Sequence, residues 1–112
     1  MAAKFQLVEV TRKHKGQDIP TEYQCEIQQH TSISILKEGV LVNTFMLGDM
    51  AEYDSYNLSY YGKILGITKA TVVVEKTGGK TRHLSLYEFC WRNYDFDLEK
   101  KAAENSDTMN YI

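Results

Sequence analysis

Proline, cysteine and long apolar runs are all scarce in this sequence, and each scarcity narrows what the chain can be. Proline occurs once and cysteine twice among 112 residues, and no low-complexity run or fixed-period repeat is visible. We therefore expect neither a linker between two domains nor a solenoid of repeats. No segment approaches the roughly 18 consecutive apolar residues that span a bilayer, and the first residues lack the apolar stretch of a secretory signal. We expect a cytoplasmic protein without membrane contact.

The residues that usually carry metal and redox chemistry are few and scattered. Cys25 and Cys90 lie far apart with no second pair, which predicts two buried small hydrophobic residues rather than a bridge. Among His14, His30 and His83, the closest approach to a cysteine in sequence is that of His30 to Cys25, and no Cys-x-x-Cys or His-x-x-x-His spacing occurs. No nucleophile, base and orienting group can be recognised as a set. We therefore expect no enzyme activity, no metal and no cofactor.

What is present fits an ordinary folded domain. The chain is 43% hydrophobic and 25% charged, which is typical of globular proteins. We expect one domain over residues 1–112, in which a β-hairpin region (1–44) packs on a barrel region (45–98), followed by a short helix and tail (99–112). The predicted fold class is mainly β (α+β): a small antiparallel β-barrel or curled sheet of about six or seven strands, with one or two short helices near the C-terminus.

In the first half, β-forming residues predict a strand over Phe5–Arg12, and the glycine, aspartate and proline of Lys13–Thr21 predict a loop. Alternation from Tyr23 to Ile27 predicts a half-buried strand. A hairpin then follows, with strands Ile33–Leu36 and Val40–Phe45 around a three-residue loop that pairs Leu36 with Val40 and Ile35 with Leu41.

In the second half, a turn at Gly48-Asp49 leads to a strand that ends near Tyr53, followed by a polar loop over Asp54–Ser59. Three β-prone segments come next, at Tyr60–Thr68, Thr71–Glu75 and Lys80–Leu84, and Gly78-Gly79 joins the last two as a two-residue turn. This turn would place Glu75 opposite Arg82 as a cross-strand ion pair.

Two helices are predicted after these strands. Ser85 followed three residues later by Glu88 is the signature of a helix N-terminus, with Leu86, Phe89, Cys90 and Asn93 at helical spacing. A second short helix is expected from about Asp97 to Asn105, because acidic residues fill its first turn.

The order of these elements from Phe45 to Asn93 resembles small SH3-like barrels, including the Tudor-like and KOW-like modules of nucleic-acid and chromatin proteins. The residues that carry the resemblance are Gly48-Asp49, Tyr61-Gly62-Lys63-Ile64, Thr71-Val72-Val73-Val74 and Gly78-Gly79. Such barrels usually bind a partner through aromatic side chains near their loops. The resemblance thus implies a binding role for Tyr53, Tyr56, Tyr60 and Tyr61.

Charge and aromatic residues point to the same part of the chain. Residues 60–92 hold six basic and two acidic side chains, a balance of +4 within a protein of net charge −2. Basic groups that contact phosphates, beside tyrosines that stack on bases, would form a surface for single-stranded or structured nucleic acid. The candidate binding residues are Tyr53, Tyr56, Tyr60, Tyr61, Lys63, Arg82 and Arg92. The alternative is that some rings complete the core and the cations are solvated.

Three functions remain open from the sequence. The first is a non-catalytic binding module for nucleic acid. The second is a protein-interaction or inhibitor domain, like many accessory proteins of viruses and mobile elements. In support of it, the tyrosine-rich segment 53–61 has the mixture of tyrosine, serine and asparagine that binding loops favour. The third is a structural homodimer formed through an exposed strand edge. The only tryptophan, Trp91, lies in a densely aromatic segment and is expected in the core, but it becomes the leading interface anchor if it is exposed.

Overall fold

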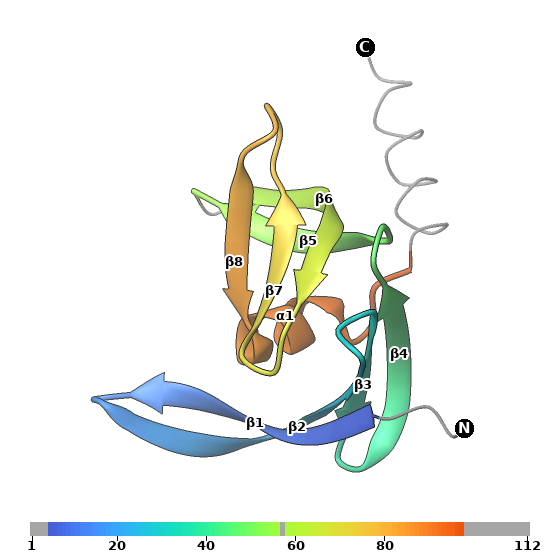
Figure 1. The fold of residues 1–112 in the computed structure, drawn as a ribbon. Helices are drawn as coiled ribbons and strands as arrows, with labels where there is room; N and C mark the ends of the chain where they lie inside the picture. Colours follow the sequence, from blue (N-terminus) through green and yellow to red (C-terminus); the bar gives the residue numbers. More distant parts are fainter. Residues whose placement is uncertain (1–4, 57, 98–112) are drawn as a thin grey trace.

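The computed structural model describes residues 5–56 and 58–97, which form eight strands and one helix (Figure 1). Two four-stranded antiparallel sheets have the strand orders β1-β2-β3-β4 and β5-β6-β7-β8. The predicted mainly β fold with a helix near the C-terminal end is confirmed, with eight strands instead of six or seven. The elements are β1 (Phe5–His14), β2 (Gln17–Gln28), β3 (Ser32–Lys37), β4 (Val40–Met46), β5 (Met50–Ser55), β6 (Leu58–Ile67), β7 (Thr71–Glu75), β8 (Thr81–Ser85) and α1 (Leu86–Asn93).

The loop predicted over Lys13–Thr21 is wrong, because β1 and β2 continue through it as a two-stranded ribbon. The ribbon turns at Lys15 and Gly16, whose φ angles of 52° and 78° suit a tight hairpin turn. Pro20 is tolerated within β2 because β3 pairs with β2 only over residues 23–28, which leaves the outer edge of the ribbon without a strand partner. Figure 1 shows this ribbon, the β1–β2 arm, projecting away from β3 and β4.

The predicted register of the β3–β4 hairpin is also wrong. The turn holds two residues, Glu38 and Gly39, both with positive φ, so Leu36 lies opposite Leu41 instead of Val40. The register then shifts, and Ile35 lies opposite Asn43. An extra residue in one strand produces such a shift, which periodicity alone does not reveal.

The predicted register of the β7–β8 hairpin is wrong by one residue. The strand Thr71–Glu75 is found as predicted, but the turn is one residue longer than expected, since the Lys76 N–H donates to the Lys80 carbonyl (2.6 Å). Arg82 therefore lies opposite Val74, and the predicted Glu75–Arg82 ion pair does not form. Similarly, the predicted polar loop over 54–59 is replaced by paired strand ends, with Asp54 opposite Ser59.

The first predicted helix is confirmed as α1. The hydroxyl of Ser85 accepts a hydrogen bond from the Glu88 N–H (3.2 Å), which caps the helix. Its buried residues are the four expected from helical spacing: Leu86, Phe89, Cys90 and Asn93. The second predicted helix, from Asp97 to Asn105, lies almost entirely outside the described residues. No helix of the described part has the length and apolar character needed to cross a membrane.

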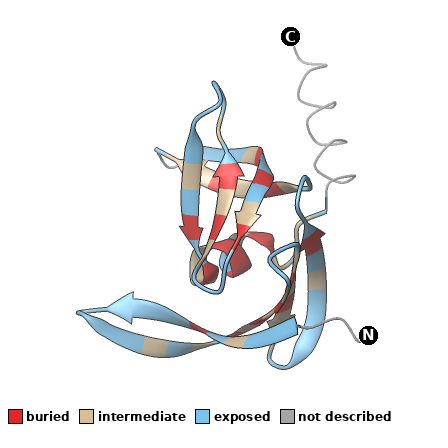
Figure 2. Cartoon of the chain, in the orientation of Figure 1, coloured by how far each residue is buried: buried red, intermediate tan, exposed pale blue. Residues whose placement is uncertain are grey.

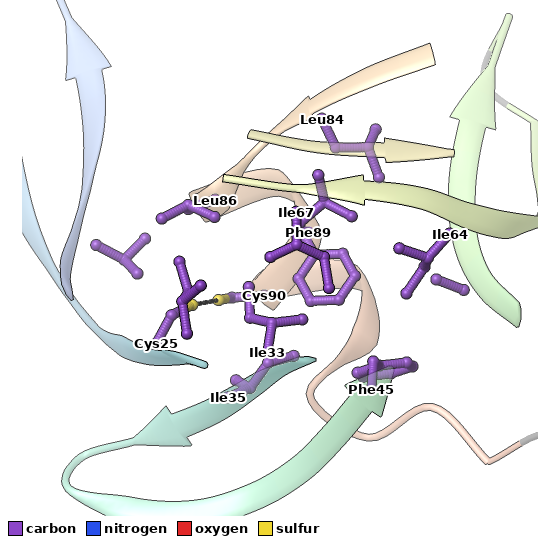
Figure 3. Packing of buried hydrophobic residues seen from close by; sticks show 14 of the residues in the cluster. Cys25, Ile33, Ile35, Phe45, Ile64, Ile67, Leu84, Leu86, Phe89 and Cys90 are labelled. Atoms are coloured by element: carbon purple, nitrogen blue, oxygen red, sulfur yellow. Dashed lines mark hydrogen bonds between the residues drawn. The ribbon is translucent and has the colours of Figure 1, made fainter. Parts of the chain in front are cut away.

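One hydrophobic core joins both sheets and α1. Figure 2 shows the buried residues concentrated where the helix meets the sheets. Phe89 is fully buried and meets Phe45 of β4 edge to face, with the ring centroids 5.2 Å apart. Side chains from both sheets surround these rings (Figure 3). The hairpin region and the barrel-like region thus share a single interior, which supports one folding unit.

Candidate functional site

The four candidate tyrosines do not share one surface. Tyr53 is 1% exposed and stacks on Tyr60, with the ring centroids 5.7 Å apart, so it is part of the core. Tyr61 is half-buried against Phe96. Tyr56, at the β5–β6 turn, is 94% exposed, while Tyr60 is exposed only along part of its ring. Two of the four rings are therefore presented to solvent.

The three candidate cations lie in different environments. Lys63 is exposed on β6, opposite Met50 of β5. Arg82 of β8 and Arg92 of α1 are instead engaged with carboxylates. Phosphate contact by either arginine would require breaking these ion pairs.

These arginines belong to an ion-pair cluster, the carboxylate–arginine cluster, formed by Glu52, Asp54, Arg82, Glu88 and Arg92. Asp54 bridges both arginines, at 3.2 Å from Arg82 and 3.4 Å from Arg92. Arg82 also reaches Glu88 at 3.5 Å, and Arg92 reaches Glu52 at 3.8 Å. With two positive and three negative groups, the cluster has a formal charge of −1, which opposes rather than attracts a phosphate.

Burial shapes the electrostatics of this cluster. Desolvation raises the pKa of Glu88 above its ordinary 4.5, and the nearby charge of Arg82 offsets only part of this effect. The Nε atoms of both arginines are buried without a hydrogen-bond partner among the described residues. The cluster therefore orients its side chains at some cost in desolvation.

Replacing Glu88 with glutamine tests this electrostatic description. A carboxyl group whose pKa is raised on folding stabilises the fold while protonated, and the contribution is lost as the pH rises through the folded-state pKa. Glutamine removes this titration. We expect the unfolding free energy of Glu88→Gln, relative to that of the unmodified protein, to increase between about pH 4 and about pH 7. Urea denaturation followed by circular dichroism measures this difference, and a constant or decreasing value would contradict the description.

Beside the cluster, α1 presents Trp91 to solvent. Its side chain is 52% exposed, contrary to the core position expected from the sequence, and the Arg92 guanidinium lies 5.1 Å from its ring centroid. Trp91 borders a shallow hollow of about 350 Å³. We call this area the Trp91 surface, and its residues are Glu52, Trp91, Arg92, Tyr94, Asp95 and Phe96.

Asn93 holds this surface in place. Its side-chain Oδ1 accepts a hydrogen bond from the Glu52 N–H (2.7 Å), and Nδ2 donates to the carbonyls of Glu52 and Phe89 (3.0 Å each). Nδ2 of Asn43 on β4 then donates to the carbonyls of Asn93 (3.1 Å) and Phe96 (2.8 Å). The end of α1 is thus tied to strands of both sheets. Helical spacing placed Asn93 on the buried face, but nothing in the sequence indicated these partners.

The β1–β2 arm forms a second feature that the sequence interpretation missed. Arg12, Lys13, His14 and Lys15 follow one another at its exposed tip, where only Lys13 has a described ion pair, with Asp18 (2.8 Å). Between the arm, β8 and α1 lies an open cleft of about 560 Å³, bordered on another side by Lys69. The sequence signal for this feature is the run of basic residues from Arg12 to Lys15, most of which fall in the segment predicted as a loop.

Comparisons with known proteins do not assign the chain to a family. No family model, curated protein or solved structure matches the chain. Within the described residues, no group of three or more histidine, cysteine, aspartate or glutamate side chains is arranged to hold a metal ion. Fold and surface therefore define the chain only as a two-sheet, mainly β protein with an exposed tryptophan beside an ion-pair cluster.

Proposed function

We propose that this protein is a non-catalytic module that binds another protein through the Trp91 surface. The observation that carries the proposal is the half-exposed ring of Trp91 on a helix whose end is fixed by Asn93. Large aromatic side chains on rigid elements are the usual anchors of protein interfaces, because little conformational entropy is lost when they become buried. The proposal assigns no catalytic residue, metal or cofactor.

Charge suggests the chemistry of the partner. The carboxylate–arginine cluster, Asp95 and Lys37, whose ammonium lies 4.3 Å from the Tyr94 ring centroid, together hold four acidic and three basic groups, a local charge of −1. Acidic groups around an aromatic anchor favour a partner with lysine or arginine side chains at the rim of its contact surface. We therefore propose a basic protein surface as the partner.

Trp91→Ala is expected to weaken partner binding by about 2 kcal/mol, or roughly 30-fold, with little loss of stability because half of the ring is exposed. Affinity capture from a nuclease-treated lysate and mass spectrometry identify the partner, and calorimetry on purified proteins measures the affinity. Tyr56→Ala is the matched control, since it removes an even more exposed ring, at the β5–β6 turn, that is not part of the Trp91 surface. Equal binding by the Trp91 variant and the unmodified protein would refute the proposal.

Nucleic-acid binding is a second candidate, and the basic tip of the β1–β2 arm favours it. Residues 11–18 hold three positive charges and one negative charge, a balance of +2 on an exposed two-stranded ribbon. A ribbon of this kind fits the major groove of a DNA duplex. Tyr56, Tyr60 and Lys63 remain the exposed part of the surface predicted from the sequence.

The double variant Arg12→Gln/Lys15→Gln distinguishes these two nucleic-acid surfaces. If the arm binds, the slope of log affinity against log salt concentration should decrease by about two, because two phosphate contacts are lost. Fluorescence anisotropy with labelled single- and double-stranded oligonucleotides measures the slope. Lys63→Gln is the control and should leave it unchanged. Weaker binding only with Lys63→Gln would instead favour the surface around Tyr60, and no binding at low salt would exclude both.

The other functional predictions made from the sequence are supported by fewer observations. A homodimer through β4 is opposed by side chains that already occupy edge groups: the Thr44 N–H donates to Asn43 Oδ1 (3.0 Å), and the Met46 N–H donates to Asp49 Oδ2 (2.9 Å). The SH3-like resemblance of β5–β8 and the role as a viral or mobile-element accessory protein stay predictions. So does a cytoplasmic location, where a reducing environment keeps thiols free.

A further inference from the structure

The two cysteines of the chain, 65 positions apart, meet inside the core (Figure 3). Sγ of Cys25 on β2 lies 3.2 Å from Sγ of Cys90 on α1. Both residues are free and fully buried. A disulfide requires a sulfur–sulfur distance of about 2.05 Å, so the two atoms are about 1.2 Å from bonding distance. A bond here would join the first sheet to the helix that follows the second sheet.

We propose that Cys25 and Cys90 are a site of reversible oxidation, at which an intramolecular disulfide ties α1 to β2. The oxidant is a low-molecular-weight disulfide such as oxidised glutathione. One cysteine thiolate attacks it, forming a mixed disulfide and releasing one small thiol. The second cysteine thiolate attacks the sulfur of the first, which releases the other small thiol. Two protein thiols are oxidised, one small disulfide is reduced, and the two thiol protons end on the released thiols.

Burial controls the rate of this reaction. The hydrogen-bonded contact with Cys25 and then desolvation raise the pKa of the Cys90 thiol, so the closed core disfavours the reactive thiolate. The reagent therefore reaches the pair only when α1 separates from β2. Once the helix returns, the 3.2 Å contact favours attack within the molecule over attack by a second chain.

The disulfide would stabilise the fold without covering the exposed ring next to it. Cys90 faces the core, whereas its neighbour Trp91 is half exposed. A cross-link over so long a loop restricts the unfolded chain strongly. Oxidation is thus expected to raise the melting temperature on the order of 10 °C. This inference does not depend on the proposed partner binding.

The test uses the whole protein in glutathione buffers of increasing oxidising strength, with mild denaturant below the unfolding transition so that α1 can open. Reactions start from both reduced and oxidised protein, and equilibrium is reached when the two starting points agree. Free thiols are then alkylated, and the intact mass is measured. The expected product has lost two hydrogen atoms, carries no alkyl group, gives a linked peptide containing Cys25 and Cys90, and returns to the lower melting temperature with dithiothreitol.

Cys25→Ser and Cys90→Ser are the matched controls, which can form only mixed or intermolecular disulfides and should gain no thermal stability. The inference is overturned if the unmodified protein remains doubly alkylated at equilibrium in oxidised glutathione alone. It is equally overturned if its products are only glutathione adducts or cross-linked dimers.

Discussion

Gly62→Ala is expected to lower the free energy of unfolding by about 3 kcal/mol, a large effect for a single methyl group. Gly62 lies on β6 where the chain passes close to β7. A Cβ atom there would collide with the backbone carbonyl oxygen of Glu75 and approach the Tyr53 ring to 3.1 Å. The carbonyl belongs to a paired strand and cannot rotate away as a flexible side chain would, so the two strands must separate.

Gly66→Ala is a matched control for this prediction, because it adds the same methyl group to the same strand. There the nearest atoms belong to the Val73 side chain at 3.8 Å, an ordinary contact distance. We expect a change within about 1 kcal/mol. Chemical denaturation of both variants measures the two values. Similar stabilities for the two variants would show that β6 and β7 do not approach each other as described.

Asn93→Leu is expected to cost about 3 kcal/mol of stability although leucine is a common residue in buried helix positions. The substitution leaves the partly buried N–H and carbonyl of Glu52 without the Asn93 amide, and an unpaired group shielded from water costs about 1–3 kcal/mol. Because Asn93 fixes the end of α1, the variant should also weaken partner binding without altering Trp91 itself.

Asn43→Ala is the comparison variant for Asn93→Leu. It removes two hydrogen bonds to the carbonyls of Asn93 and Phe96, but from a side chain that lies only partly buried. Water can replace such a donor, so we expect a loss of about 1 kcal/mol. Thermal and urea unfolding of both variants test whether Asn93→Leu is the more destabilising substitution. A greater loss for Asn43→Ala would contradict the central role of the Asn93 amide.

Local sequence signals predicted most of the fold. The strand Thr71–Glu75 and the cap at Ser85 were found where they were expected, because alternation and capping chemistry act over a few residues. The predicted hairpin registers were wrong, since one extra residue in a turn changes which residues lie opposite each other along the whole hairpin. The error at Gly78-Gly79 alone gave Arg82 the wrong partner, and only the packed structure reveals Asp54 and Glu88 beside it.

The candidate site was harder to predict than the fold, because it depends on which face of each element turns outward. The four tyrosines are close in sequence but lie in different elements: Tyr53 is buried within β5, whereas Tyr56 is exposed in the turn that follows β5. The aromatic density around Trp91 favoured burial, yet α1 is short and buries only one face. Contacts between distant segments, such as Cys25 with Cys90, leave no local pattern to read.

The intrinsic fluorescence of Trp91, the only tryptophan, tests the central claim most directly. In the free protein a half-exposed indole should emit at the long wavelength of a hydrated ring and be quenched by acrylamide. When the captured partner, replaced where necessary by a variant lacking its own tryptophans, is added, the emission should shift to shorter wavelength and become protected from acrylamide. A complex that forms while emission and quenching stay unchanged would show that the partner binds elsewhere, and the Trp91 surface would lose its assigned role.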